Sequence, residues 1–189
     1  YTLWYNRPAF NRGGDFTYPV ARGYPYDEDW ERWSLPIGNG SMGACIFGRT
    51  DIERIQLSEK TLGNKGPYQF GGFTNFAEIY IDVNHNYSKN YKRTLNLNEA
   101  ISTVNYQYEN VEYTREYFAN YPSQIIAVKL KADKPGMISF TIRPTIPYLK
   151  PFDKEQNGRS GHVQVLPGLI TMTGNIQYLS LIHISEPTR

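Results

Sequence analysis

The chain has 189 residues, which is room for one domain of ordinary size but too little for two complete ones. Its 20 Lys and Arg residues nearly balance 18 Asp and Glu residues, and a net charge of +2 argues against nucleic acid as the main partner. No apolar run approaches the roughly 18 to 20 residues of a membrane span, so no membrane-spanning segment is expected. A single cysteine, Cys45, excludes an internal disulfide. The 16 Tyr, 9 Phe, 16 Gly and 12 Pro residues are typical of β-proteins and of carbohydrate-binding proteins.

Both ends of the sequence read as artificial boundaries. The chain opens at Tyr1 without a targeting segment, so we expect a mature or cut start. Residues 179–189 resemble one translated frame of an adapter used in short-read library preparation, and we expect them not to be native. The alternative is a real strand from Ile176 to Ile184 followed by a turn. Without the tail, residues 1–178 would be an incomplete domain, truncated at its C-terminal end with an unpaired sheet edge.

Short strands are predicted in the first half of the chain. One segment, residues 51–62, also has apolar residues near helical spacing, so a short helix there is the alternative to a strand. Cys45 lies in an apolar segment and is predicted to be a small buried hydrophobe. No long helix is predicted. The three strand candidates are Ala44–Phe47, Glu53–Leu57 and Glu78–Val83.

The clearest periodicity lies between Ile101 and Arg143, where apolar side chains recur at every second position and turn-forming residues interrupt them. Half-buried antiparallel strands have this pattern, so we predict a β-meander. Turns are expected at Glu109-Asn110 and at residues 120–123. The side chains expected to face the core are Val104, Tyr106 and Tyr108; Val111, Tyr113, Arg115 and Tyr117; Ile126, Val128 and Leu130; and Ile138, Phe140 and Ile142.

The last part of the chain completes an all-β pattern. Residues 144–161 contain three prolines and a polar patch, which predicts a long exposed loop before strands at His162–Leu166 and Leu169–Thr173. Many short strands, frequent turn signals and the lack of strand–helix alternation predict antiparallel sheets packed face to face. The predicted fold class is therefore an all-β, antiparallel β-sandwich.

The segment from Gly38 to Gly43 has the glycine spacing of a dinucleotide-binding fingerprint. That fingerprint follows a strand and opens a helix, whereas the residues after Gly43 are too few and too β-like to form one. We predict instead a glycine turn leading into a strand, in which Asn39 is able to adopt the left-handed conformation.

Acids and histidines offer no catalytic or metal-binding pattern. Hydrolysis of a glycosidic bond needs a pair of carboxyl groups, but most acids here, such as Glu112 and Glu116, lie beside basic residues at positions expected to face solvent. His85 and His162 are far apart in sequence, with no helical Glu between them. We therefore predict no catalytic residue, metal site or cofactor in this chain.

Aromatic residues are candidates for sugar contact, because an amphipathic ring can stack on the C–H face of a pyranose. The tyrosines on strand faces are explained by cross-strand packing. Trp4, Trp30 and Trp33 are possible stacking platforms. Trp30 and Trp33 are the stronger candidates, since they fall in a predicted loop just before the glycine turn and are less easily assigned to the core.

An ordered series of short motifs covers most of residues 3–142. The motifs are LWY at 3–5, WSLPIGNGSMGA at 33–44, ERIQLSEKTL at 53–62, YKRTLNL at 91–97, VEYTREYFA at 111–119 and ADKPG at 132–136. This series resembles the N-terminal domain of glycoside hydrolase family 95. The resemblance implies a large bacterial exo-glycosidase as the parent, typically an inverting α-L-fucosidase, which acts on fucosylated glycans in the periplasm or outside the cell. It also implies that the N-terminal domain is a β-super-sandwich and that a following (α/α)6 barrel, absent here, carries the catalytic Glu, Asn and Asp side chains.

One departure from the family pattern concerns the sugar. Where the family often has Thr-Leu-Trp-Ser followed by Gly, this chain has Thr-Leu-Gly-Asn-Lys-Gly at 61–66. An α-L-galactosidase parent is the competing possibility, because a site built for fucose rejects the extra 6-hydroxyl by only about 1 to 3 kcal/mol. A carbohydrate-binding module is a further alternative. Gly38, Asn39, Gly40 and Glu59 are expected to contact the barrel or its ligand. Loops with unusual backbone conformations and few apolar side chains are poorly suited to a hydrophobic core.

Overall fold

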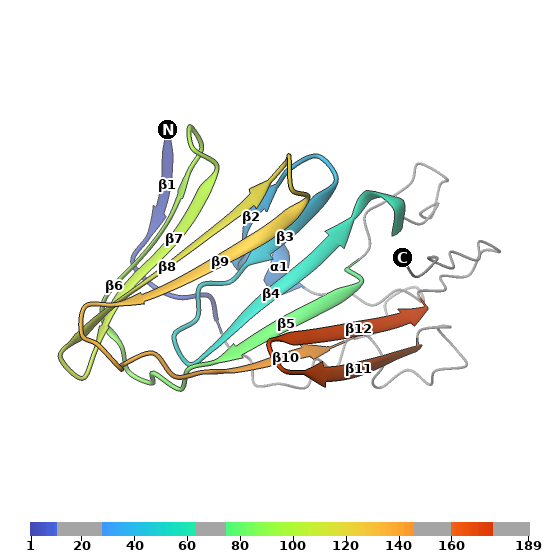
Figure 1. The fold of residues 1–189 in the computed structure, drawn as a ribbon. Coiled ribbons are helices and arrows are strands. Elements are labelled where there is room, and N and C mark those ends of the chain that lie inside the picture. The colour runs from blue at the N-terminus through green and yellow to red at the C-terminus, as the bar shows by residue number, and fades with distance from the viewer. Residues whose placement is uncertain (11–27, 63–74, 146–159, 176–189) are drawn as a thin grey trace.

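The computed structural model describes residues 1–10, 28–62, 75–145 and 160–175. Two five-stranded antiparallel sheets pack face to face, with a separate two-stranded hairpin beside them (Figure 1). The predicted all-β sandwich is therefore confirmed. Residues 146–159, which are most of the loop expected at 144–161, and the C-terminal tail from residue 176 lie outside the described residues, so the adapter interpretation stays a prediction.

Sheet A contains most of the predicted meander. Its strand order is β1-β6-β7-β8-β9, and every neighbouring pair is antiparallel. The β7–β8 turn has positive φ angles at both Glu109 (47°) and Asn110 (61°), which is the backbone of the two-residue turn that matches strand twist. The strands are β1 Thr2–Tyr5, β6 Lys89–Asn96, β7 Ile101–Tyr108, β8 Val111–Asn120 and β9 Ile125–Ala132.

Sheet B has the order β10-β5-β4-β3-β2. Pro36 lies in β2, an edge strand, where the missing N–H of proline is tolerated. The ambiguous segment at 51–62 forms a strand and then a short 3-10 turn, so the helical alternative was wrong. The strands are β2 Leu35–Gly38, β3 Met42–Ile46, β4 Ile52–Glu59, β5 Ala77–Asp82 and β10 Thr141–Thr145, with the 3-10 turn η2 at Lys60–Leu62.

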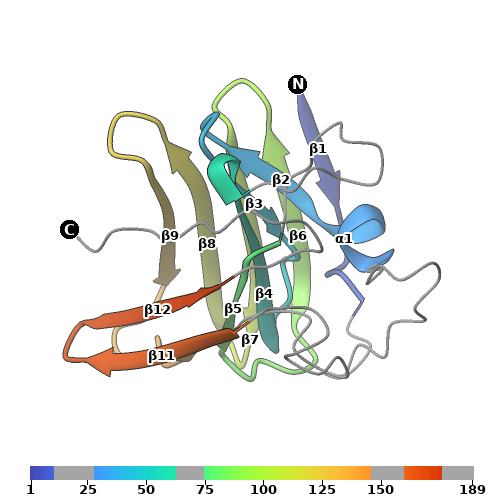
Figure 2. The same ribbon diagram turned by 90° about the vertical axis from the view of Figure 1, so that its right-hand side faces the viewer.

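Two smaller elements flank the sandwich (Figure 2). The strands β11 Ser160–Leu166 and β12 Leu169–Asn175 form the predicted C-terminal hairpin. A six-residue helix, α1 Glu28–Trp33, precedes β2. Trp30 and Trp33 therefore lie in a short helix rather than in the predicted loop.

The core fills the space between the two sheets. The inward positions predicted on β7 and β8 are confirmed, because Val104, Tyr106, Val111, Tyr113 and Tyr117 are all buried. Side chains from sheet B meet them from the other side, and further partly buried residues from β9 complete the layer. The sheet B members of the core are Leu35, Ile37, Ala44, Ile46, Ile55 and Ile81.

The fourth strand of the predicted meander differs from expectation. β10 leaves sheet A and pairs with β5 on the edge of sheet B, where Arg143 Nη2 donates to Asp82 Oδ1 at 2.7 Å. Residues 133–140 cross from sheet A to sheet B and belong to neither β9 nor β10. The exposed fractions of Ile138, Phe140 and Ile142 are 44%, 41% and 42%, so their predicted half-buried face is wrong. Cys45 on β3 is also only partly buried, not a core residue.

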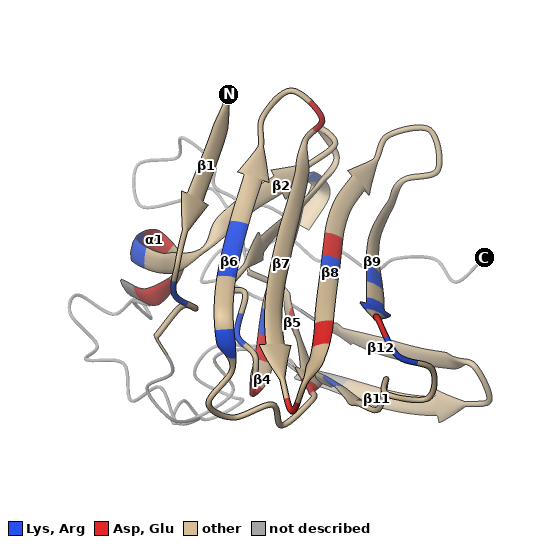
Figure 3. Cartoon of the chain, turned by 90° about the vertical axis from the view of Figure 1, so that its left-hand side faces the viewer, with Lys and Arg blue, Asp and Glu red and all other residues tan. Residues whose placement is uncertain are grey.

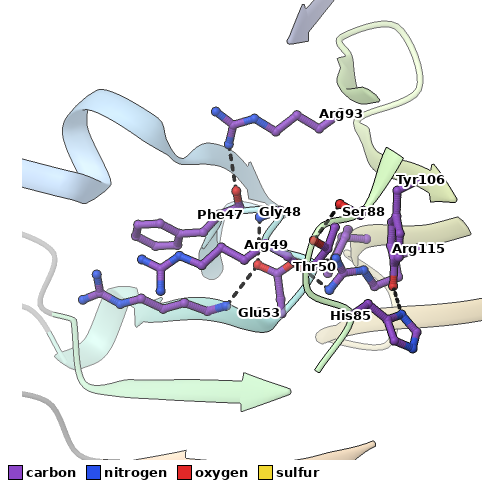
Figure 4. A network of polar contacts seen from close by, with 12 residues as sticks. Phe47, Gly48, Arg49, Thr50, Glu53, His85, Ser88, Arg93, Tyr106 and Arg115 are labelled. Atoms are coloured by element: carbon purple, nitrogen blue, oxygen red, sulfur yellow. Dashed lines mark hydrogen bonds and ion pairs between the residues drawn. The ribbon is translucent and has the colours of Figure 1, made fainter. Parts of the chain in front are cut away.

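A polar network joins the sheets at the β3–β4 loop, residues 47–50 (Figure 4). Cations and a hydroxyl from sheet A reach the carbonyl oxygens of three consecutive loop residues. Arg93 Nη1 donates to Phe47 O at 2.9 Å, Tyr91 Oη to Gly48 O at 2.5 Å, and Arg115 Nη2 to the carbonyl of Arg49. These bonds satisfy carbonyl groups of the loop that would otherwise be buried without a hydrogen-bond partner.

Glu53 on β4 holds the other end of this network. Its Oε1 accepts from the backbone N–H groups of Gly48 at 2.8 Å and Arg54 at 3.0 Å. Its Oε2 accepts from Tyr117 Oη at 2.7 Å and lies 3.0 Å from Arg115 Nη1. The side chains of Glu53 and Arg115 are 0% and 1% exposed, so their charges are paired in the interior rather than solvated.

A second buried ion pair lies within sheet B. Arg54 Nη2 donates to Glu78 Oε1 at 2.6 Å, and Gln56 and Tyr80 also donate to this carboxylate. Burial alone would raise the pKa of Glu78, but the Arg54 guanidinium and these hydrogen bonds hold it below its usual value. The carboxylate therefore stays ionised inside the fold.

Gly48 provides a test of how tightly this loop is packed. Its φ is +70°, and an added Cβ would lie 2.7 Å from Tyr91 Oη and 3.1 Å from Arg93 Cδ. Gly48→Ala should therefore lower the free energy of unfolding by about 2 to 4 kcal/mol, from left-handed strain and overpacking together. Gly136→Ala is the matched control, because φ is +74° there and nothing lies within 4 Å. Denaturant unfolding would measure both, and equal losses would contradict the packing argument.

Candidate functional site

Four of the six predicted contact residues meet at one end of the sandwich. The β2–β3 turn at residues 38–42 lies beside the end of β4, since Met42 pairs with Glu59 and Lys60 N donates to Ser41 O at 2.9 Å. We call this end, formed by residues 38–42, 59–62 and 120–124, the rim. The rim contains Gly38, Asn39, Gly40 and Glu59.

Asn39 organises the rim. Its Oδ1 accepts from the backbone N–H groups of Ser41 at 3.0 Å and Met42 at 2.8 Å, which closes the turn. Its Nδ2 donates to Asn120 O at 2.9 Å, at the end of β8 in the other sheet. The left-handed residue of the turn is Gly40, with φ of +87°, and not Asn39 as expected. Asn39 thus connects the β2–β3 turn of sheet B to the end of β8 in sheet A.

Glu59 ends β4 and caps the 3-10 turn that follows. Its Oε2 accepts from Thr61 N at 2.8 Å and from the Thr61 hydroxyl. This is the hydrogen bonding of an N-cap residue, which satisfies backbone donors at the start of the turn. The side chain is partly exposed on the rim. Its carboxylate is held in one orientation, as a residue that contacts a neighbouring group needs to be.

Trp30 and Trp33 lie at the other end of β2, on α1 next to β1 (Figure 2). Trp33 is half-buried, its ring stacks on Phe10 with centroids 6.4 Å apart, and the Arg7 guanidinium lies 5.3 Å from it. Trp30 is 48% exposed. The structure therefore separates both tryptophans from the rim, and only Trp30 presents an open ring.

The alternative chemistries can be checked against these positions. The glycine motif forms a β-hairpin between β2 and β3, which is not the strand-to-helix turn that holds a pyrophosphate. Across the described ranges, no three His, Cys, Asp or Glu side chains gather as metal ligands would. No helix in the same ranges is long and apolar enough to cross a membrane. Of the three buried carboxylates in the described ranges, Asp29, Glu53 and Glu78, the two glutamates are held by arginines.

A recess opens at the end of the sandwich opposite the rim, around His85. The recess is open, and the space of about 250 Å³ around it includes solvent at its mouth. Its inner part admits little more than a water molecule. His85 Nδ1 lies 2.9 Å from Tyr106 Oη, and the His85 ring stacks on Tyr108 with centroids 4.5 Å apart. Tyr113 packs on the same ring at 4.3 Å. Sequence analysis placed these tyrosines in cross-strand packing but missed the histidine among them.

Fold and contacts together define a β-sandwich domain whose charged interior serves its packing, with an ordered polar rim at one end. Comparison with known proteins gives the family. Residues 3–69 and 63–187 match the family described as "Glycosyl hydrolase family 65, N-terminal domain". The chain belongs to this family of N-terminal domains.

One relative of the chain is a much longer protein. The chain is 28% identical over 178 residues to Alpha-L-fucosidase 2 of Arabidopsis thaliana, an alignment that covers 72% of this chain. It covers 21% of that fucosidase, so the chain spans about a fifth of its relative's length. The chain is therefore homologous to one part of a much longer fucosidase.

The His85 recess predicts a pH dependence of stability. Burial, and then the positive charge of Arg115, lower the pKa of His85 in the fold, whereas Glu109 opposes them. The unfolded chain thus binds the proton more readily. Stability should be greatest above about pH 6.5, the usual value for histidine, and should fall as pH drops from there towards the folded-state pKa.

Urea unfolding between pH 7.5 and 5.5 would measure this loss. His85→Asn should flatten the profile in that window. His162→Asn is the control, because His162 is exposed on β11 and its removal should leave the profile unchanged. A wild-type midpoint that rises as pH falls would contradict the argument.

Proposed function

We propose that this chain is the non-catalytic N-terminal domain of an exo-acting, inverting glycoside hydrolase of family 95, and that the parent removes terminal L-fucose from glycans. The observation that carries this proposal is the similarity to a plant α-L-fucosidase. The ordered motif series of residues 3–142 supports family 95 within the wider match. Periplasmic or extracellular location is part of the proposal, since such glycans lie outside the cytoplasm.

The internal chemistry of the domain supports a non-catalytic role. Glycoside hydrolysis needs one carboxyl group that gives up a proton and another that accepts one or attacks. Glu53 and Glu78 are buried among arginine and hydroxyl donors, out of reach of a substrate. The catalytic acid and the water-activating groups are then supplied by the parent's barrel domain.

The rim is the proposed contact with that barrel or with its ligand. Asn39 fixes the β2–β3 turn to the end of β8, so the rim is rigid and its exposed groups have defined positions. Glu59 is the residue assigned to contact, because its charged side chain is oriented by Thr61 and reaches the surface. Gly38 and Gly40 keep this surface free of side chains.

Two alternatives have specific support. An α-L-galactosidase parent differs by one hydroxyl on the substrate, and the altered segment at 61–66 directly follows the rim's Glu59 and Lys60. A carbohydrate-binding module is supported by Trp30, whose ring is 48% exposed on α1. The first changes the parent's substrate, and the second changes the role of this domain.

The assignment to a non-catalytic domain is tested by assaying the isolated chain beside its full-length parent. With 4-nitrophenyl α-L-fucoside, the chain should release no nitrophenol, whereas the parent should release it. The matching α-L-galactoside distinguishes the two parents, since the preferred sugar gives the larger kcat/KM. Hydrolysis by the isolated chain would overturn the proposal.

The rim is tested in the parent by Glu59→Gln, which keeps the size of the side chain and an oxygen for Thr61. We expect kcat/KM to fall about tenfold, or about 1.4 kcal/mol, because a charged contact with the barrel or ligand is lost. The melting temperature should stay within about 1 °C, since the residue is surface-exposed. Glu112→Gln on the outside of β8 is the control. Unchanged kinetics for Glu59→Gln would contradict the proposed contact between the rim and the barrel or its ligand.

A further inference from the structure

Trp4 is the most exposed tryptophan in the described part of the chain, with 63% of its surface open to solvent. It lies on β1, the edge strand of sheet A, directly opposite Thr94 of β6. The neighbouring pair, Leu3 and Leu95, belongs to the row that turns inward, because Leu95 is 5% exposed. Trp4 and Thr94 therefore project from the outer face of sheet A.

The register of the sheet continues this row across all five strands. Thr94 pairs with Thr103, Thr103 with Glu116, and Glu116 with Lys129. Neighbouring strands are about 4.8 Å apart, so the row from Trp4 to Glu116 is about 14 Å long. An indole at one end, two hydroxyls in the middle and a carboxylate at the other end thus lie in one straight line. Figure 3 looks onto this face.

The charge distribution along the row is uneven. β1 and β7 contain no charged residue, and the charged residues of sheet A lie on β6, β8 and β9 (Figure 3). Glu116 and Lys129 are paired at 3.5 Å and are 33% and 56% exposed, so their charges partly offset each other. Beside Trp4 the row itself carries only hydroxyl groups, and the nearest charge on this face is Lys92, two residues before Thr94 on β6. This chemistry suits a neutral polyhydroxylated ligand.

A second row beside the first is also polar. Lys92 pairs with Asn105, and Asn105 pairs with Thr114, whose Oγ1 donates to Asn105 Oδ1 at 2.9 Å. Phe118, 36% exposed, lies on the other side of the first row. The apolar rings of Trp4 and Phe118 are thus separated by polar side chains. A protein partner would be expected to meet one contiguous apolar patch.

We propose that the outer face of sheet A binds a neutral oligosaccharide. Trp4 stacks against one pyranose ring, and Thr94, Thr103 and Glu116 form hydrogen bonds with hydroxyl groups along the oligosaccharide. An aromatic ring with polar groups aligned beside it is the arrangement that recognises a sugar, since the ring covers the C–H face and the polar groups meet the hydroxyls. The site is separate from the rim and from α1. It rests on the proposed function only for the choice of a fucosylated probe.

The proposal is tested by titrating the whole chain with 2′-fucosyllactose and following tryptophan fluorescence and binding heat. We expect saturable binding, and Trp4→Ala should weaken it at least about tenfold, as for other central aromatic contacts. Thr103→Val, which keeps the shape and removes the hydroxyl, should weaken binding several-fold. Circular dichroism and melting should be unchanged for Trp4→Ala, because the ring is exposed on an edge strand.

Trp30→Ala is the matched control, because it removes another exposed indole that lies off this face. It should leave the affinity unchanged. Absent binding, equal affinity for Trp4→Ala, or loss of affinity only in Trp30→Ala would overturn the proposal. So would sugar-independent self-association that Trp4→Ala abolishes, since the face would then belong to a second copy. Hydrolysis by the parent is a separate readout, so failure here leaves the proposed function standing.

Discussion

The structure depends on the way in which sheet A donates hydrogen bonds to the β3–β4 loop of sheet B. The loop turns inside the sandwich, and its backbone carbonyls at residues 47–49 point away from any strand ladder. Arg93 and Arg115 deliver charged donors to them, and Glu53 balances the charge of Arg115. Removing one partner of such a buried set leaves an uncompensated group, which costs about 3 to 5 kcal/mol. The two sheets are thus fixed to each other by directional bonds as well as by packing.

This internal use of charge gives two buried acids, Glu53 and Glu78, a structural role in the domain. A catalytic carboxyl group has to exchange protons with a substrate, so it needs access and an adjustable environment. Glu53 accepts three hydrogen bonds and is paired with Arg115, and Glu78 is 3% exposed and bound by Arg54. Such groups stabilise one conformation. Under the proposed function, this domain provides a rigid surface and a partner domain supplies the reactive groups.

The sequence was sufficient where burial and alternation agree, as in β7 to β9, where tyrosine and valine face the core and Thr, Glu and Lys face out. It was insufficient for β6, because an inward position holds Arg93, which reads as a solvent-facing residue. The short strands β1 and β2 have too few residues for a periodic signal. The crossing of β10 to sheet B is a tertiary choice, stabilised by Arg143 and Asp82, that no local pattern encodes.

The same distinction applies to surfaces. Gly38, Asn39, Gly40 and Glu59 could be grouped from sequence because all of them interrupt strands, and the β3–β4 register then brings them together. Trp4 could not be placed, because its direction depends on pairing with β6, a strand that was itself missed. Since the inward residues of sheet A pack against sheet B and donate to the β3–β4 loop, the outward row from Trp4 to Glu116 takes no part in joining the two sheets. A row that does not join the sheets, yet which places an indole and hydroxyls in line, is free to serve recognition.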